Sequence, residues 1–188
     1  MIGRFVSAVV LLVVVATELL AVGPPTNRNP RYNPTINPDY NPTINPKYNP
    51  SINPKYAPTI NPKYNPSINP KYNPSINPKY NPTINPQYNP SINPKFNPAL
   101  DPSKSTWSGM YIFDLRGKVI GLLVRAEESV LLRFTPSGEW VGYAVGNSES
   151  GYNLFEADGS WTGEYLSPNS EGGYDGFDGQ EEWVHYSR

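Results

Sequence analysis

Apolar residues follow three different patterns along this 188-residue chain. Residues 5–16 read FVSAVVLLVVVA, an almost continuous apolar run. From Asn29 to Pro102, isoleucine and tyrosine alternate at every fourth position within polar tetrads, as in NPTINPKY at residues 41–48. After Lys104 aromatic residues begin to recur about every 21 positions. These patterns divide the chain into residues 1–23, a repeat arm over 24–103 and a C-terminal region over 104–188.

The N-terminal run predicts export. Arg4 precedes it and the small residues Ala16 and Ala21 follow it, which is typical of a secretory signal peptide. Glu18 interrupts the run before apolar residues resume at 19–22, so an uncleaved N-terminal anchor is the alternative. We therefore expect a secreted or extracytoplasmic protein, with a membrane tether if the segment is retained.

The arm carries proline at every fourth position from Pro30 to Pro102, nineteen times in all. Proline excludes a regular helix, and the missing backbone donors exclude the interior of a sheet. Asn followed by Pro favours type I turns in which the Asn side chain accepts bonds from backbone amides. We expect a disordered or turn-rich spacer that spans on the order of 200 Å if it is fully extended at ~3.1 Å per residue.

Charge separates along the same boundary. Residues 24–103 hold eight basic and two acidic residues, whereas residues 104–188 hold six basic and thirteen acidic ones. Lysines spaced by eight residues are too dilute for a nucleic-acid patch, so no nucleic-acid partner is predicted. The chain has no cysteine, so it contains no disulfide and must fold by packing alone.

A second repeat fills residues 104–188. The stretches FDLRGKV, FTPSGEW, FEADGSW and FDGQEEW each start with Phe and end six residues later with Val or Trp. This spacing predicts β-hairpins with three-residue loops, in which the first and last residues face each other across the strands. The predicted core pairs are Phe113 with Val119, Phe134 with Trp140, Phe155 with Trp161 and Phe177 with Trp183, and the predicted turn glycines are Gly117, Gly138 and Gly159.

Four such hairpins predict an all-β domain. Because one hairpin is only marginally stable, we expect the four pairs to face inward around a pseudo-fourfold axis, in a flower-like or small open barrel. The opposite face, including Arg133 and Leu154, is expected to be partly exposed. In the fourth hairpin Glu181 replaces the turn glycine and His185 replaces a later one, so this hairpin is expected to turn differently.

This Phe-x-x-x-Gly-x-Trp/Val-x-Gly repeat resembles the four-fold β-flower domain proteins over residues 107–188. The family consists of small exported or membrane-linked β domains with no settled activity. The resemblance implies a flower-like fold. Its likeness to lipid-binding tubby-type domains makes a lipid or hydrophobic ligand conceivable.

The sequence offers few side chains of the kinds that catalytic sites use. His185 is the only histidine, so neither a Ser-His-Asp triad nor a multi-histidine metal site is predicted. A pair of acids can serve a glycosidase, but the acids are scattered over turns and strand faces as solvating residues are. We expect no enzyme, no cofactor and no metal. The acids weighed for this role are Glu156, Asp158, Glu164 and Asp175.

Two functions follow from this organisation. The first is a non-catalytic extracytoplasmic binding module displayed on the proline-rich arm as a stalk, with an unidentified protein, glycan or lipid ligand. The alternative is a structural or adhesive surface protein in which the arm, with its regularly spaced Tyr and Lys, is the working part. The C-terminal domain, residues 104–188, is expected to fold alone.

Overall fold

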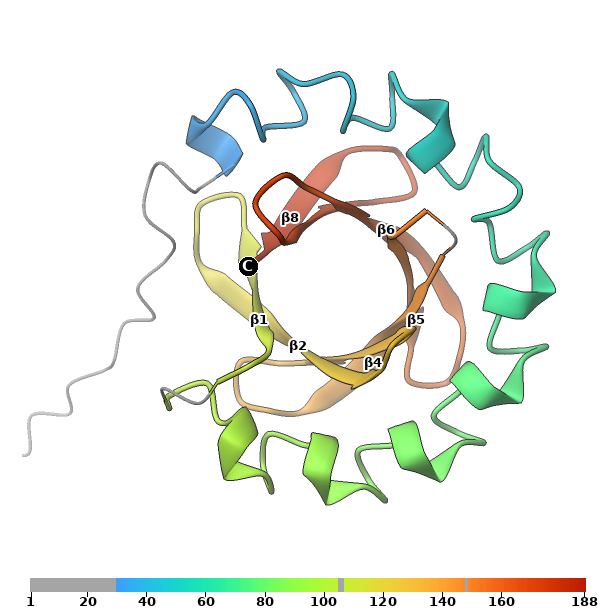
Figure 1. Ribbon diagram of the computed structural model, residues 1–188, viewed down its shortest axis with the longest axis vertical. Helices are drawn as coiled ribbons and strands as arrows, with labels where there is room; N and C mark the ends of the chain where they lie inside the picture. Colours follow the sequence, from blue (N-terminus) through green and yellow to red (C-terminus); the bar gives the residue numbers. More distant parts are fainter. Residues whose placement is uncertain (1–29, 105–106, 148) are drawn as a thin grey trace, which may run out of the picture.

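The computed structural model describes residues 30–104, 107–147 and 149–188 and shows a closed β-barrel encircled by the arm (Figure 1). Each strand is antiparallel to its neighbours in chain order, and β1 pairs with β8 to close the barrel. The predicted export signal or anchor, residues 1–23, lies outside the described residues. The strands are β1 (Met110–Asp114), β2 (Val119–Glu127), β3 (Val130–Phe134), β4 (Trp140–Gly146), β5 (Tyr152–Glu156), β6 (Trp161–Pro168), β7 (Tyr174–Phe177) and β8 (Trp183–Ser187).

The four predicted hairpins are β1–β2, β3–β4, β5–β6 and β7–β8, and we call their loops the hairpin tips: residues 114–118, 135–139, 156–160 and 178–182. In each tip the fourth residue donates its N–H to the first, as Gly138 does to Thr135 at 2.9 Å. Gly117, Gly138 and Gly159 have positive φ, as predicted for turn glycines. The fourth tip was wrongly expected to differ, because Glu181 adopts the same left-handed conformation at φ 69° and makes the same bond to Asp178.

Replacing Gly138 with valine is expected to lower the free energy of unfolding by ~2 kcal/mol. Gly138 has φ 79°, a region that a β-branched residue enters only with steric strain. Chemical denaturation of the whole chain measures the loss. Ser137→Ala, at the neighbouring exposed position of the same tip, serves as the control and should change stability by less than ~0.5 kcal/mol. Equal effects of the two changes would contradict the requirement for a left-handed residue.

Each predicted core pair lies directly across its hairpin. The structure pairs Phe113 with Val119, and the three Phe–Trp pairs follow the same register. A β-bulge separates each pair from the rest of the ladder. Without the bulge Leu132 would face Gly142, but with it Leu132 faces Tyr143, the next residue of β4. Three of the Phe rings also stack on a tyrosine ring of the neighbouring hairpin. The ring centres are 5.6 Å apart for Phe155 and Tyr143, 5.6 Å for Phe177 and Tyr165, and 5.2 Å for Phe113 and Tyr186.

The inward direction predicted for these pairs is wrong. Phe134 and Phe155 belong to an outer layer of side chains that packs against isoleucines of the arm, such as Ile84. A separate inner layer, which includes Leu131 and Leu154, fills the barrel. Leu154 is buried there and not partly exposed, as was expected. Because strand residues alternate between faces, a closed barrel buries one face inside while the arm covers the other.

His185 fills the inside of the barrel in place of a glycine. In the first two hairpins a large residue on the first strand opposes glycine on the second: Ile112 pairs with Gly121 and Arg133 with Gly142. The fourth hairpin reverses this order, because Gly176 pairs with His185 and a Cβ at Gly176 would collide with the imidazole ring. The exchange keeps one large side chain at this level of the barrel.

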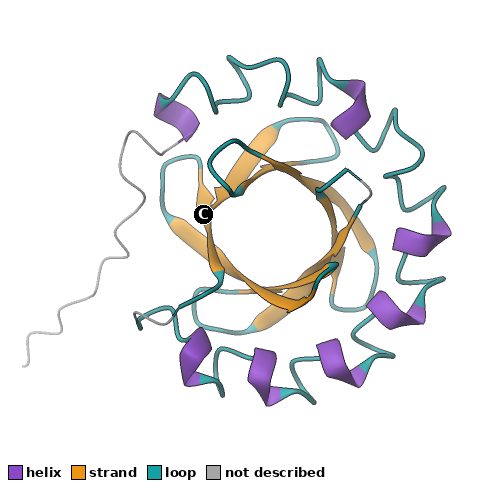
Figure 2. Ribbon diagram, in the orientation of Figure 1, coloured by secondary structure: helices purple, strands orange, loops and turns teal. Residues whose placement is uncertain are grey.

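Over residues 30–103 the arm consists of successive turns and contains no regular helix or strand, as its prolines predicted (Figure 2). Each Asn side chain from Asn37 to Asn97 makes two kinds of bond. The Asn45 oxygen accepts the Lys47 N–H at 2.9 Å, and its Nδ2 donates to the Pro38 carbonyl seven residues earlier at 2.9 Å. These bonds link each turn to an earlier one. The short 3-10 segments of the arm are η2 (Pro30–Tyr32), η3 (Pro50–Ile52), η4 (Pro66–Ile68), η5 (Pro74–Ile76), η6 (Pro82–Ile84), η7 (Pro90–Ile92) and η8 (Pro98–Leu100).

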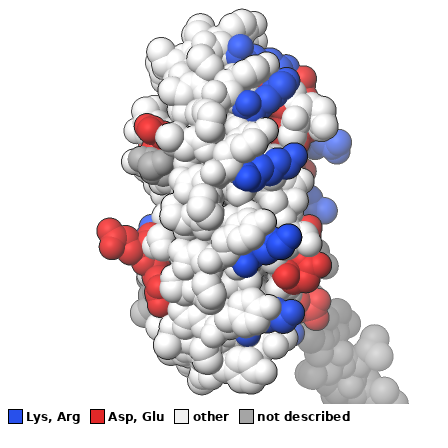
Figure 3. Space-filling view, turned by 90° about the vertical axis from the view of Figure 1, so that its right-hand side faces the viewer, with Lys and Arg blue, Asp and Glu red and all other residues white. Residues whose placement is uncertain are grey.

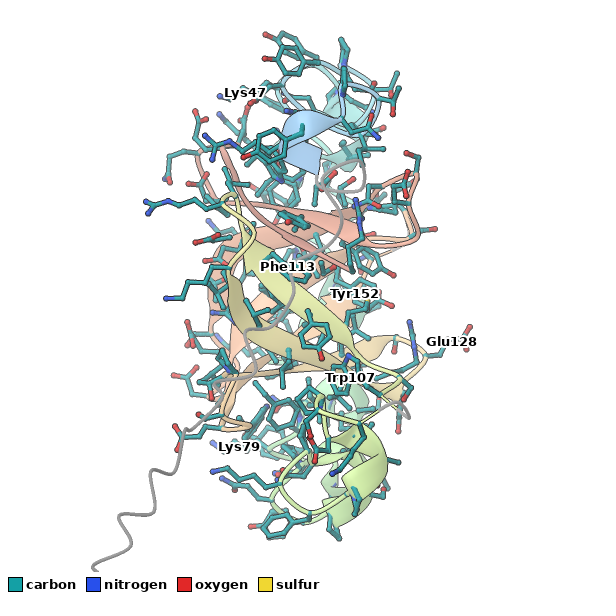
Figure 4. The ribbon with its side chains drawn as sticks, turned by 90° about the vertical axis from the view of Figure 1, so that its left-hand side faces the viewer. Lys47, Lys79, Trp107, Phe113, Glu128 and Tyr152 are labelled. Carbon is teal, nitrogen blue, oxygen red and sulfur yellow. The ribbon has the colours of Figure 1, made fainter. Side chains whose placement is uncertain are left out.

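The expectation of an extended spacer is wrong for the described part of the arm. The arm curves around the barrel, and Figure 4 shows Lys47 and Lys79 at opposite sides of it with Phe113 of β1 between them. The physical reason is the eight-residue period, which returns each isoleucine to the same side of the arm. Ile36, Ile60 and Ile84 are at most 1% exposed, and Asn153 of β5 donates to the Ile60 carbonyl at 2.9 Å.

Candidate functional site

The outer edge of the arm carries a row of nine aromatic side chains, which we call the tyrosine row. All of them are large, and all are 55–72% exposed. They occupy the last position of each octad, the eight-residue unit Asn-Pro-Thr/Ser-Ile-Asn-Pro-Lys-Tyr. The members are Tyr32, Tyr40, Tyr48, Tyr56, Tyr64, Tyr72, Tyr80, Tyr88 and Phe96.

The octad orients this row by dividing its side chains between two sides of the arm. Ile60 and the following Asn61 are buried against the barrel, whereas Lys63 and Tyr64 are exposed. The Tyr64 N–H donates to the Asn61 carbonyl at 3.0 Å, which closes the turn that sends the ring outward. The buried isoleucines therefore hold each exposed ring at a fixed place around the barrel.

The lysines of the arm form a regular column beside the acids of the hairpin tips (Figure 3). Lys47 Nζ lies 2.6 Å from Glu182, and Lys55 Nζ lies 3.0 Å from Glu181. Lys95 Nζ lies 3.7 Å from Glu139 on the second tip. The separation of charge between the two parts of the sequence thus brings a basic arm onto acidic tips. Ion pairs between exposed side chains contribute little to the free energy of unfolding, so these pairs orient the arm on the tips more than they stabilise the fold.

Grooves run between the arm and the hairpin tips. One of 570 Å³ lies between Arg31, Tyr40 and the first tip. Two smaller grooves of 360 and 340 Å³ lie on either side of Trp161. A fourth, 250 Å³, lies at the second tip beside Lys95 and Leu122. Of the predicted core residues, Phe155, Trp161 and Trp183 line grooves, and the two tryptophans are half-buried.

Three titratable groups, Arg133, Glu164 and His185, meet inside the barrel at the end nearest the tips. Arg133 lies 3.5 Å from Glu164, and His185 Nε2 lies 3.9 Å from the same carboxylate oxygen. Burial lowers the pKa of His185 to about 4, and the neighbouring Arg133 adds to this effect. His185 is therefore a neutral packing residue at neutral pH.

Asp175 of β7 is the most deeply buried acid that was considered for catalysis. Its side chain accepts a bond from Asn169 at 3.3 Å, and it is 1% exposed. Burial raises the pKa of Asp175 to about 7, although Arg188 and the Asn169 bond oppose the shift. The other acids lie elsewhere: Asp158 caps the third tip through the Ser160 N–H, and Glu164 faces the barrel interior. Glu164 and Asp175 therefore lie on different strands and have different partners, whereas Glu156 and Asp158 share the third tip.

The pH dependence of stability is expected to contain two opposing parts. The raised pKa of Asp175 makes the folded protein hold a proton that the unfolded chain releases, so stability falls as pH rises from about 4 to 7. The lowered pKa of His185 makes the unfolded chain bind the extra proton, so stability falls as pH drops from 6.5 to 4. The aspartate part amounts to ~4 kcal/mol and the histidine part to ~3 kcal/mol, since one unit of pKa corresponds to ~1.4 kcal/mol.

Two isosteric variants separate these parts in chemical denaturation series between pH 4 and 7. Asp175→Asn is expected to become less stable on acidification, because only the histidine contribution is left. His185→Gln is expected to become less stable as pH rises, because only the aspartate contribution is left. A series for either variant that parallels the wild type would contradict the assignment.

The tyrosine row follows from a period that is visible in the sequence, whereas the buried tyrosines Tyr143 and Tyr165, of which Tyr165 lines a groove, were not predicted. Their spacing, three or four residues after each Trp, is the signal that was available. Among the described residues no group of His, Asp and Glu is arranged to hold a metal ion. Nor does any helix in the described ranges have the length and apolar character needed to cross a membrane.

Comparisons with protein-family models, with curated proteins and with solved structures found no match to this chain.

Proposed function

We propose that this protein is a non-catalytic adhesive binding protein in which the arm is the working part and the barrel is its scaffold. The tyrosine row carries the proposal. A single octad buries Ile60 completely while Tyr64 is 70% exposed, and the pattern repeats around the barrel. The packing of residues 30–103 on the barrel supports this proposal over one in which the arm is a stalk for a separate binding module.

A polysaccharide chain suits this row better than a membrane or a flat protein surface. Each ring is isolated from the next by polar groups, such as Ser67 and Asn69 between Tyr64 and Tyr72. Such polar residues between the rings do not favour insertion of the row into lipid. A polymer with a regular repeat can engage many weak, evenly placed aromatic contacts at once, and such multivalent binding multiplies individually small affinities.

Co-sedimentation with insoluble polysaccharides (chitin, cellulose and peptidoglycan) tests the proposal on the full chain. The test variant replaces Tyr48, Tyr56 and Tyr72 with serine, since these three residues line none of the grooves. We expect the wild type to sediment with at least one polysaccharide and the serine variant to lose ~10-fold or more in affinity. Its stability should change little, because all three rings are exposed.

The matched control replaces the same three residues with phenylalanine, which keeps the rings and removes only the hydroxyls. It is expected to retain binding. Phospholipid vesicles form the second arm of the experiment. Capture by vesicles and by none of the polysaccharides, or equal binding of the serine variant and the wild type, would overturn the proposal.

We further propose that the four hairpins are related by a pseudo-fourfold axis, as the resemblance to β-flower domains implies. The repeated cross-strand pairs and the stacking of Phe155 on Tyr143, Phe177 on Tyr165 and Phe113 on Tyr186 support it. An extracytoplasmic location remains part of the proposal and rests on the apolar run at residues 5–16.

A further inference from the structure

The 340 Å³ groove beside Trp161 has features that the tyrosine row lacks. It lies where the arm crosses the fourth hairpin tip, and we call it the Trp161 groove. Its volume is at the lower end of the range for small-molecule sites, about 300–1,000 Å³. The residues that define it here are Lys55, Lys63, Tyr64, Trp161, Tyr165 and Glu181.

Two buried donors of the groove have no partner within the described part of the chain. They are the Tyr165 hydroxyl and the Trp161 indole Nε1, and the Tyr165 side chain is only 3% exposed. A buried donor without a partner costs about 1–3 kcal/mol. The chain therefore keeps two polar groups here at a cost to stability, which is expected where they bind something.

Packing alone does not require the Tyr165 hydroxyl. Tyr165 of the third hairpin pairs with Phe177 of the fourth, just as Leu122 of the first hairpin pairs with Phe134 of the second. Leu122 lines the equivalent groove at the second tip, next to Lys95. A hydrocarbon side chain therefore serves the same structural place, and the groove at the second tip is a natural comparison without the hydroxyl.

The charges of the Trp161 groove leave one lysine uncompensated. Lys55 is paired with Glu181 at 3.0 Å. Lys63 has no carboxylate within 4 Å in the described ranges, and its ammonium lies 5.7 Å from the centre of the Trp161 ring. Asp178, a further acid near Tyr165, accepts the Gln180 and Glu182 N–H groups. Burial, with Glu181 and Asp178 nearby, raises the pKa of Tyr165, so its hydroxyl stays a donor.

We propose that the Trp161 groove binds a small carboxylate-bearing sugar, such as a uronic acid, by placing its carboxylate between Lys63, the Tyr165 hydroxyl and the Trp161 indole N–H. Three donors and one uncompensated positive charge suit an anion that accepts several hydrogen bonds. The exposed ring of Tyr64 offers an aromatic surface for the apolar face of a pyranose. The site takes a single small ligand and goes beyond the polymer binding proposed for the tyrosine row.

Titration calorimetry and tryptophan fluorescence on the full chain test the site with three probes: D-glucuronate, D-glucose as its neutral match, and inorganic phosphate. We expect D-glucuronate to bind and to change the emission of Trp161, and D-glucose to bind at least ~10-fold more weakly, since the charged hydrogen bonds are lost. No response to D-glucuronate at tens of millimolar would overturn the proposal. Phosphate binding as tight as D-glucuronate binding would also overturn it, because the groove would then recognise any anion.

Variants identify the residues that carry the binding. Tyr165→Phe is expected to weaken D-glucuronate on the order of 10-fold while leaving the protein as stable or more stable, since it removes an unpartnered hydroxyl. Lys63→Gln is expected to abolish the preference for D-glucuronate over D-glucose. Lys95→Gln at the second tip is the matched control and should bind like the wild type. If Tyr165→Phe and Lys63→Gln both bind like the wild type, the proposal fails, whatever the tyrosine row binds.

Discussion

Removing the arm, so that the chain begins at Lys104, is expected to abolish the cooperative unfolding transition. The outer layer of the barrel includes Leu132, Phe134 and Phe155, which the arm covers with its isoleucines. Each large side chain left uncovered forfeits ~1.5–3 kcal/mol of hydrophobic stabilisation, and small domains are stable by only ~5–15 kcal/mol. We therefore expect the fragment to bind a hydrophobic dye and to show no sharp thermal melt. This expectation replaces the prediction from the sequence that residues 104–188 fold alone.

A chain that begins at Pro30 is the control for this deletion and should melt like the full chain. Adding a peptide of residues 30–104 to the fragment provides a second measurement. The peptide is expected to restore the transition and suppress dye binding, because it again covers the outer layer. A fragment that melts cooperatively near the full-length temperature would show that the barrel does not depend on the arm.

Phe155→Ala is expected to cost ~3–5 kcal/mol in the full chain, the typical loss for a large aromatic residue in a packed core. Phe155 is 2% exposed, faces Trp161 across its hairpin and stacks on Tyr143. Phe96→Ala is a matched control, since the same substitution then falls on the tyrosine row, where Phe96 is 67% exposed. It should change stability by less than ~0.5 kcal/mol. Similar losses for the two variants in urea denaturation would contradict the two-layer arrangement.

The pairing of the hairpins was predictable because it depends on local chemistry. The distance from Phe134 to Trp140 and the glycine between them determine the loop, and the loop determines which residues face each other. The direction of these residues was not predictable in the same way. Strand alternation defines two faces, and only the position of the arm decides that the aromatic face lies outside and Leu154 inside.

The docking of the arm had two signals in the sequence, but the arm was interpreted as a spacer. One was the opposite charge of the arm and the C-terminal domain, which brings Lys55 to Glu181. The other was the eight-residue period of the isoleucines, which places Ile36, Ile60 and Ile84 on one side. The candidate site was predicted in part. The period of tyrosine and lysine indicated an arm with an exposed function, but the Trp161 groove needs contacts between segments about 100 residues apart, as between Lys63 and Trp161.

Because the arm curves around a barrel of fixed circumference, the barrel limits how many octads the arm can contain. Tandem repeats in a free spacer can be gained or lost in whole units, because only reach changes. Here the loss of one octad would preserve the inward position of every isoleucine but shift each later lysine to a different hairpin tip, so that Lys95 would no longer stand opposite Glu139. The number of octads is therefore restricted by the circumference of the barrel, because a gain or loss of one octad would change which lysine faces which hairpin tip.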